Sequence, residues 1–138
     1  MAQFIEFVGN HWILSTVWVG LVVALALHRT KSAGESVSPQ QAVMLINRSN
    51  AVVLDIRDKK DFDAGHIVDA IHIPLSKLDS RITELDKHKA VPVVVACRLG
   101  QHSADAVKAL RKAGFTQVLR LAGGMIEWRA QNLPLVQK

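Results

Sequence analysis

The first 28 residues constrain the architecture of this chain more than any other feature. Glu6 is the only acidic or basic residue before Arg29, and the run from Phe7 to Leu27 carries no charge over 21 residues. At about 1.5 Å of rise per residue, a helix of that length crosses the roughly 30 Å hydrocarbon core of a bilayer. Residues 1–28 are therefore predicted to form a short N-terminal tail and a transmembrane helix.

The charges that flank this run distinguish an anchor from a secretory signal peptide. Ala24-Leu25-Ala26 resembles a small-x-small cleavage site, but a signal peptide carries its positive charge before the apolar region. This chain has Glu6 before the run and Arg29 and Lys31 soon after it. By the positive-inside rule we expect an uncleaved anchor, with the tail outside and the remainder in the cytoplasm. A cleaved signal peptide and a buried globular helix are the alternatives.

Composition excludes several classes of function. The chain has 17 Lys+Arg against 12 Asp+Glu, but the basic residues are scattered among acids in runs of no more than two. This pattern fits solubility or attraction to a membrane surface, and no nucleic-acid partner is expected. The single cysteine excludes an internal disulfide framework, zinc fingers and iron–sulfur ligation.

The rest of the chain alternates between helical and strand patterns. Residues 29–36 are small, polar and charged, as is typical of a linker, so the folded domain is expected over 37–138. Ser38-Pro39 has the pattern of a helix N-cap followed by Pro at the first helical position. Short β-branched runs predict strands over 51–55, 70–75, 91–96 and 118–121. Strands that alternate with helices indicate an α/β fold with a parallel sheet.

The sole cysteine, Cys97, directly follows the most hydrophobic of these strands. Ligands bind outside the carboxyl ends of parallel strands, so this position is a candidate site. Residues 98–102 lead to a helix for which Ser103 is the expected N-cap, and loop N–H groups before a helix stabilise a thiolate. Gly100 permits the backbone turn that such a loop needs. On placement alone, Cys97 is equally an ordinary buried residue.

Further motifs occupy most of the domain. They are Val53-Leu54-Asp55-Ile56-Arg57, Asp61-Phe62, Gly65-His66-Ile67, Ala70-Ile71-His72-Ile73-Pro74, Cys97-Arg98-Leu99-Gly100, Gly114-Phe115, Gly123-Gly124 and Trp128. In this order, over residues 37–136, they resemble the rhodanese homology domain. The resemblance implies a parallel-sheet domain with helices on both faces. With the anchor in front, the chain resembles the bacterial membrane-anchored, single-domain members of that family.

The resemblance implies a sulfurtransferase. Cys97 would be the nucleophile that takes a sulfane sulfur from a donor such as thiosulfate and passes it to a thiol or to cyanide. The substrate-binding residues would be Arg98, Leu99, Gly100, Gln101, His102 and Arg57. No metal or organic cofactor is implied, and the partners are a sulfur donor, a thiol acceptor and a membrane protein. The implied location is the bacterial inner membrane, as a single-pass protein with a cytoplasmic domain.

One position departs from the resemblance. Many catalytic members carry a cation late in the loop, where this chain has His102, and histidines as a class change charge near neutral pH. Phosphatase relatives of the same fold would need Arg at position 103, which is Ser103. His66, His72 and His102 lie on three segments and are interpreted as surface or hydrogen-bonded residues, not as a metal site. The alternative function is a non-catalytic binding or redox-sensing module that recruits partners at the membrane.

Overall fold

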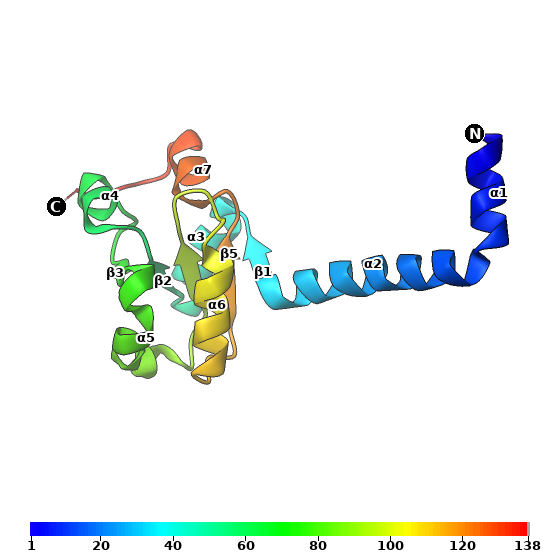
Figure 1. Ribbon diagram of the computed structural model, residues 1–138. Helices are drawn as coiled ribbons and strands as arrows, with labels where there is room; N and C mark the ends of the chain where they lie inside the picture. Colours follow the sequence, from blue (N-terminus) through cyan, green and yellow to red (C-terminus); the bar gives the residue numbers. More distant parts are fainter. Residues whose placement is uncertain (138) are drawn as a thin grey trace. The chain divides into compact units, whose positions relative to one another are not determined.

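The computed structural model describes residues 1–137, with the backbone alone for residues 29–33. The chain divides into two compact units, Met1–Ser32 and Ala33–Lys138. Figure 1 shows the order of the elements in each unit along the chain. The candidate site of the sequence analysis lies wholly within the second unit.

Two helices make up the N-terminal unit. Helix α1 covers Ala2–Asn10 and helix α2 covers Trp12–Ala33, and the chain bends by 92° between them. The uncharged run is thus divided at His11, whose φ of −121° and ψ of 40° are not helical. Gly9 and Asn10 directly before it are poor helix formers, which explains the position of the break.

Within the described residues, no helix alone has both the length and the apolar character needed to cross a bilayer. Only when Ala2–Asn10 and Trp12–His28 are taken together, with the bend between them, do their length and composition meet that requirement. The membrane anchor and its orientation therefore stay predictions from the sequence.

Five parallel strands form the sheet of the second unit, which confirms the predicted α/β fold. They are β1 (Glu35–Val37), β2 (Val52–Asp55), β3 (Ile71–His72), β4 (Val93–Ala96) and β5 (Val118–Leu121), in the spatial order β1-β5-β4-β2-β3. The strand predicted over 70–75 is only two residues long. The Ile73 N–H still donates to the Asp55 carbonyl of β2 at 3.1 Å, and a 3-10 turn then begins at Leu75.

Strand β1 lies at the end of the segment for which a linker was predicted. It pairs in parallel with β5, with Glu35 opposite Leu119 and Val37 opposite Leu121. The Ala122 N–H then donates to the Val37 carbonyl at 2.8 Å. A three-residue edge strand carries too short a pattern to be recognised in a sequence, because only the neighbouring strand defines it. The predicted linker over 29–36 thus ends inside the sheet.

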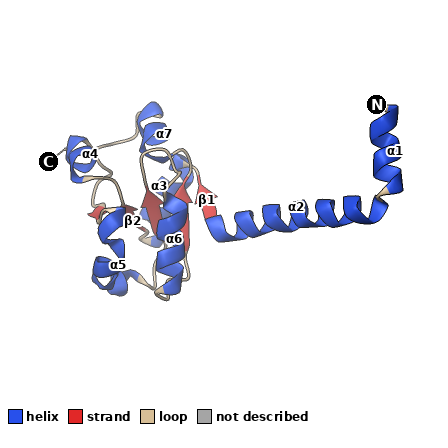
Figure 2. Ribbon diagram, viewed as in Figure 1, coloured by secondary structure: helices blue, strands red, loops and turns tan. Residues whose placement is uncertain are grey.

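Helices cover both faces of this sheet, as the family resemblance implied (Figure 2). They are α3 (Pro39–Ser49), α4 (Lys59–Ala64), α5 (Leu78–Arg81), α6 (Ser103–Lys112) and α7 (Gly124–Ala130), with the 3-10 turns η1 (Leu75–Lys77) and η2 (Ile82–His88). Helix α3 begins as predicted, since the Ser38 side chain accepts from the Gln41 N–H and the Gln41 side chain accepts from the Ser38 N–H. This reciprocal pair satisfies two backbone donors at the helix start.

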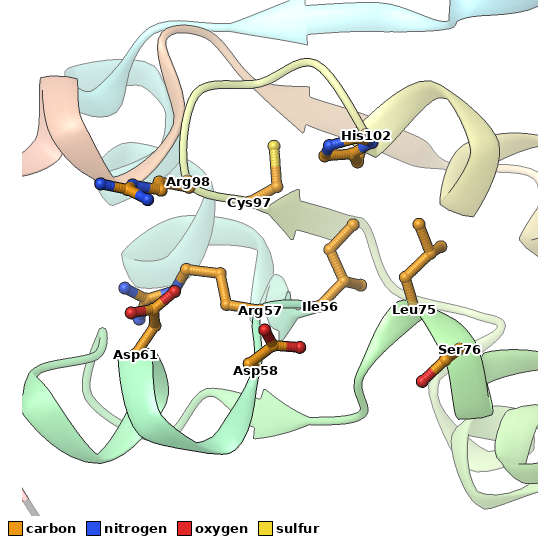
Figure 3. A pocket seen from close by; sticks show the side chains of 9 residues that line it. All are labelled: Ile56, Arg57, Asp58, Asp61, Leu75, Ser76, Cys97, Arg98 and His102. Atoms are coloured by element: carbon orange, nitrogen blue, oxygen red, sulfur yellow. The ribbon is translucent and has the colours of Figure 1, made fainter.

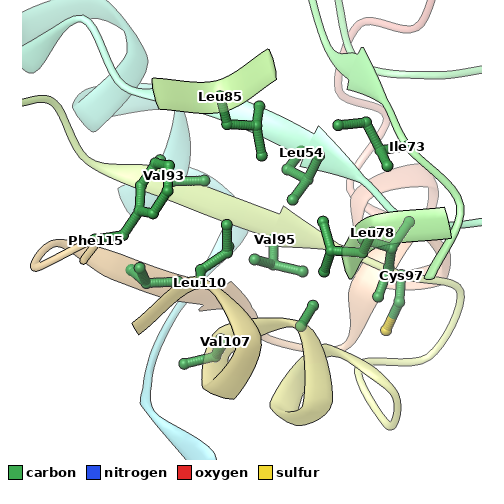
Figure 4. Close-up of a cluster of buried hydrophobic side chains, with 13 residues drawn as sticks. Leu54, Ile73, Leu78, Leu85, Val93, Val95, Cys97, Val107, Leu110 and Phe115 are labelled. Atoms are coloured by element: carbon green, nitrogen blue, oxygen red, sulfur yellow. The ribbon is translucent and has the colours of Figure 1, made fainter. Parts of the chain in front are cut away.

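Successive side chains of β4 point into two separate cores. Val93 and Val95 pack with residues of α5 and α6 on one face, in the cluster drawn in Figure 4. Val94 and Ala96 pack with residues of α3 and α7 on the other face. By the same alternation Cys97, the next residue, belongs to the first cluster. The central strand therefore delivers the cysteine to a fixed place at the edge of a packed core.

Candidate active site

The carboxyl ends of β2 and β4 lie side by side. Asp55, the last residue of β2, is opposite Ala96, the last residue of β4. The Ile56 N–H donates to the Ala96 carbonyl at 3.0 Å, which continues the pairing past the strand end. The segments that follow, 56–58 and 97–102, therefore meet at the edge of the sheet where ligands bind in parallel α/β proteins.

The loop after β4 folds around the sulfur of Cys97. The Gly100 N–H donates to Cys97 Sγ at 2.8 Å. Gly100 has a φ of +85°, in the left-handed region that glycine adopts without strain. A backbone donor of the loop is thus directed at the sulfur.

Ser103 holds this loop in place, but not in the expected way. The prediction that Ser103 is the N-cap of the following helix is wrong, because α6 begins at Ser103 and His102 occupies the cap position without a side-chain hydrogen bond. Ser103 is fully buried, so its hydroxyl has no access to water. It donates instead to the Gly100 carbonyl at 2.8 Å, which fixes the residue whose N–H contacts the sulfur.

The other side of the loop is bonded to α7. The Met125 N–H donates to the Cys97 carbonyl at 2.8 Å, and the Ile126 N–H donates to the Arg98 carbonyl at 3.2 Å. Gly124, the residue before Met125, lies between α7 and the cysteine loop and has a φ of +61°. The Gly123-Gly124 pair is therefore what allows the start of α7 to contact the cysteine loop.

Cys97 lines a hollow of about 540 Å³ at this edge of the sheet (Figure 3). The lining comes from the two strand-end segments, α4 and η1, and consists of Ile56, Arg57, Asp58, Asp61, Leu75, Ser76, Cys97, Arg98 and His102. Figure 3 shows Cys97 Sγ between Arg98 and His102, with Asp58 and Asp61 on the facing wall. The guanidinium of Arg98 is directed away from the sulfur. The hollow thus combines a thiol with both basic and acidic groups.

The residues predicted for the site occupy different positions around the thiol. Those that line the hollow are Cys97, Arg98, His102 and Arg57. Gly100 reaches the sulfur through its N–H, whereas Leu99 and Gln101 are exposed and lie outside the lining.

Asp58, Asp61 and Ser76 also line the hollow, although no prediction from the sequence included them. The binding rule for parallel strands pointed to the segment after Asp55, and Asp61 belonged to a family motif. No sequence signal placed Ser76 there, because η1 reaches the site only through the packing of the domain.

Arg57 is held by the protein itself. Its guanidinium donates to both carboxylate oxygens of Asp55 at 2.7 to 3.1 Å and to the Gly65 carbonyl at 2.8 Å. The two side chains are 5% and 1% exposed. A buried ion pair tolerates such burial only when its hydrogen bonds are satisfied, as they are here. Arg57 therefore shapes the wall of the hollow, and its charge is already balanced by Asp55.

Two of the histidines are packed against one phenylalanine. The ring of Phe62 stacks with His66 at 3.8 Å and with His72 at 4.3 Å between ring centroids. His66 Nδ1 lies 2.9 Å from the Phe62 carbonyl oxygen, and His72 Nε2 lies 2.8 Å from that of Arg57. Across the part of the chain that the structure describes, no group of three or more His, Cys, Asp or Glu is arranged to hold a metal ion.

Comparison with known proteins agrees with the fold. The rhodanese-like domain family matches residues 38–131. The chain belongs to the rhodanese-like family. The uncharacterized protein YibN of Escherichia coli strain K12 is 40% identical over 141 aligned residues, which cover 99% of each chain. The similarity to YibN thus includes the N-terminal helices as well as the rhodanese-like domain.

Two further relatives match about three quarters of the chain. The thiosulfate sulfurtransferase GlpE of Coxiella burnetii is 32% identical over 98 residues, covering 71% of this chain and 90% of GlpE. The crystal structure of a rhodanese-related protein from Thermoplasma volcanium superimposes with a TM-score of 0.68 at 27% identity, covering 75% of this chain and 99% of that one. The family and the fold that the motifs indicated are therefore confirmed.

Proposed function

We propose that this protein is a sulfurtransferase that carries sulfur on Cys97. The thiolate of Cys97 attacks the outer sulfur of a donor such as thiosulfate, the S–S bond of the donor breaks, and sulfite leaves with the bonding electron pair. The product is a Cys97 persulfide. An acceptor thiolate or cyanide then attacks the outer sulfur of the persulfide, and Cys97 leaves as a thiolate.

The hydrogen bond from the Gly100 N–H to Cys97 Sγ, at 2.8 Å, is the observation that carries this proposal. A fixed donor at the sulfur stabilises negative charge on it, which the attacking thiolate and the departing thiolate both carry. The hollow in front of Cys97 has room for a donor molecule. Because Cys97 is the only cysteine in the chain, its persulfide has no internal thiol to attack it.

The relatives support the same chemistry. GlpE, which is 32% identical to this chain, carries the name thiosulfate sulfurtransferase. In this chain Arg98 and His102 stand on either side of the sulfur and are the groups that would attract an anionic donor (Figure 3). Asp58 and Asp61 face these two groups and weaken the attraction of an anion. Because the Arg98 guanidinium is directed away from the sulfur, donor affinity is expected to depend most on His102.

We further propose that residues 1–28 anchor the protein in the bacterial inner membrane, with the rhodanese-like domain in the cytoplasm. The uncharged run from Phe7 to Leu27 and the basic residues Arg29 and Lys31 after it favour this orientation. A membrane protein is then the natural class of sulfur donor, acceptor or docking partner.

A non-catalytic binding or redox-sensing module is the second candidate function. It is favoured by the burial of Cys97, which is 3% exposed, and by His102 at a position where many catalytic members carry a permanent cation. In that case the Cys97 thiol would take up no sulfur from a donor.

Intact mass measurement separates the two candidates. The full chain in detergent micelles is treated with thiosulfate, freed of excess donor and weighed, and the expected result is a gain of one sulfur atom that cyanide removes. Cys97→Ser, which leaves no thiol, should gain nothing. Adding Ser80→Cys to that variant restores one thiol on the exposed face of α5, outside the hollow, and it should also stay unmodified. An equal gain in the relocated-thiol variant, or no gain in the wild type, would contradict the proposed function.

A further inference from the structure

A second, smaller hollow adjoins the one that contains Cys97. Its volume is about 170 Å³, and it is lined by Arg57, Asp61, Ala64, Arg98, Met125, Ile126 and Arg129. Arg57, Asp61 and Arg98 line both hollows, so the two lie next to each other at the side chain of Arg98. Figure 3 shows why Arg98 belongs to both, since its guanidinium extends from the cysteine loop away from Cys97 Sγ.

The charged groups of the second hollow leave a net positive charge. Arg57 is balanced by its buried pair with Asp55. The guanidinium groups of Arg98 and Arg129 make no hydrogen bond or ion pair with any residue that the structure describes. Against these two cations the hollow contains one carboxylate, that of Asp61. The resulting positive charge attracts an anionic group.

The guanidinium of Arg129 lies against the turn after α4, and the residue is exposed. An ideal Cβ built on Gly65 would lie 3.3 Å from Arg129 Nη2, so this guanidinium rests on the backbone of the turn after α4. The same turn is bonded to Arg57 through the Gly65 carbonyl. The absence of a side chain at Gly65 therefore leaves room for the Arg129 guanidinium beside this turn.

Apolar side chains form the rest of this hollow. Ala64 and Met125 are joined there by Ile126, which is 48% exposed. The Ile126 N–H is bonded to the Arg98 carbonyl, so this apolar wall is fixed relative to the cysteine loop. A ligand that fits here has a carbon chain that packs on Ile126 and an anionic end that reaches Arg129, and an inorganic donor has no such chain.

We propose that the second hollow is a carboxylate subsite for the sulfur acceptor, an inference that rests on the proposed function. The acceptor is a carboxylate-bearing thiol whose carboxylate binds Arg129 and Arg98 while its sulfur reaches Cys97. Its thiolate attacks the outer sulfur of the Cys97 persulfide, the persulfide S–S bond breaks, and Cys97 leaves as a thiolate. The acceptor departs with the transferred sulfur, so no oxidant or reductant is consumed.

Two sources can supply this chemistry. One is a small thiol that carries its own carboxylate, and the other is a protein cysteine with an acidic side chain close to it in the sequence. Both would use the same two guanidinium groups, so separate arms of the experiment are needed to tell them apart.

The main test compares two acceptors that differ in charge alone. Persulfide-loaded full chain in detergent micelles is mixed with 6-mercaptohexanoate or with 6-mercaptohexanol, and the loss of sulfur from Cys97 is followed by intact mass. We expect the carboxylate thiol to react about fivefold to tenfold faster at equal thiolate concentration. Arg129→Gln should remove most of that ratio and Arg129→Lys should keep part of it. Arg48→Gln, which removes an exposed arginine of α3, should leave the ratio unchanged.

A binding measurement tests the subsite without any sulfur transfer. Cys97 is the only thiol, so its alkylation by iodoacetamide is read directly from the mass of the chain. The thioether 6-(methylthio)hexanoate should slow this alkylation in the wild type, and Arg129→Gln should raise the half-protecting concentration about fivefold. If no persulfide forms but protection depends on Arg129, the proposed function fails and the subsite stands as a carboxylate site. The subsite itself would be overturned if Arg129→Gln changed neither the protection of Cys97 from iodoacetamide nor the rate ratio between the two acceptor thiols.

The two sources are distinguished with peptides. A short peptide with Asp two residues from its cysteine is compared with the same peptide carrying Asn, and both are compared with the hexanoate thiol. Faster transfer to the Asp peptide than to 6-mercaptohexanoate indicates a protein acceptor, and the reverse order indicates a small molecule. Either order supports the subsite, provided that the preference for the Asp peptide over the Asn peptide depends on Arg129. The subsite is overturned if the Asp peptide reacts no faster than the Asn peptide and 6-mercaptohexanoate reacts no faster than 6-mercaptohexanol.

Discussion

The backbone of Gly124 lies against the carbonyl oxygen of Cys97. A Cβ built on Gly124 would be 2.4 Å from that oxygen and 2.7 Å from the carbonyl oxygen of Arg98, both well inside van der Waals contact. These atoms belong to main chain on both sides, so neither can move without shifting the loop or α7. The shape of the cysteine loop therefore depends on the absence of a side chain at residue 124.

We predict that Gly124→Ala distorts the loop and prevents persulfide formation. The methyl group adds this clash to the strain of a φ of +61°, and we expect a loss of at least about 2 kcal/mol in the free energy of unfolding. Gly114→Ala is the matched control. Gly114 has a φ of +101° but its nearest neighbour is the flexible end of Lys89 at 3.7 Å. That variant should lose only about 1 kcal/mol and keep its sulfur uptake.

Chemical denaturation measures the stability of both variants, and intact mass after thiosulfate treatment measures their sulfur uptake. The role given to Gly124 is wrong if Gly124→Ala takes up sulfur as readily as Gly114→Ala.

We predict that Arg57→Met destabilises the domain strongly. The substitution leaves the carboxylate of Asp55, which is 1% exposed, without its cation. Breaking a buried pair from one side costs about 3 to 5 kcal/mol. The double variant Asp55→Leu with Arg57→Met leaves no buried charge and should recover part of that loss, which denaturation curves of the two variants will show. A double variant less stable than Arg57→Met would contradict this account.

The control for this pair is the exposed ion pair between Arg81 and Glu84. The hydrogen bond from Arg81 holds the pKa of Glu84 below its usual range. Any stability from this pair is therefore present above the ordinary glutamate pKa and is lost as the pH falls through the lowered value. Because both side chains are largely in water, Arg81→Met should change the unfolding free energy far less than Arg57→Met does.

We predict that His102 limits the affinity for an anionic donor. His102→Arg places a permanent cation beside Cys97, so the KM for thiosulfate should fall about fivefold. His102→Ala should raise the KM, because it removes a side chain that can donate a hydrogen bond to the donor. Steady-state thiosulfate assays of the three proteins measure both changes. Three equal KM values would show that His102 takes no part in donor binding.

We predict a single-pass topology with the C-terminus in the cytoplasm. A cytoplasmic reporter fused after Lys138 should be active, because Arg29 and Lys31 follow the uncharged run and only Glu6 precedes it. The N-terminus of the mature protein should still be at or near Met1. An active phosphatase reporter that works only in the periplasm, or a mature N-terminus at residue 27 or later, would contradict the predicted anchor.

Much of the fold could be read from local patterns. The run ending at Ala96 consists of β-branched and small side chains that suit a strand buried on both faces, so it marked the central strand and placed Cys97 at its carboxyl end. Ser38 and Pro39 marked the start of α3 because capping depends on neighbours three residues away. The signals failed where an element is very short, as for β1 in the predicted linker and for the two residues of β3.

By itself, then, the sequence determined the strand that ends at Cys97, the family of the domain, and the separation of an uncharged N-terminal segment from a charged remainder. These features depend on residues close together in the chain, whose spacing and polarity are visible directly. The tertiary structure alone decided that Gly124 lies against Cys97, that Ser103 bonds back to Gly100, and that Arg129 stands beside Arg98 in a second hollow. The hydrogen bonds from α7 to the cysteine loop join residues about 28 positions apart, and the contact between Arg129 and Gly65 spans more than twice that distance in the sequence. Such contacts leave no local pattern, because the packing of helices on the sheet creates them.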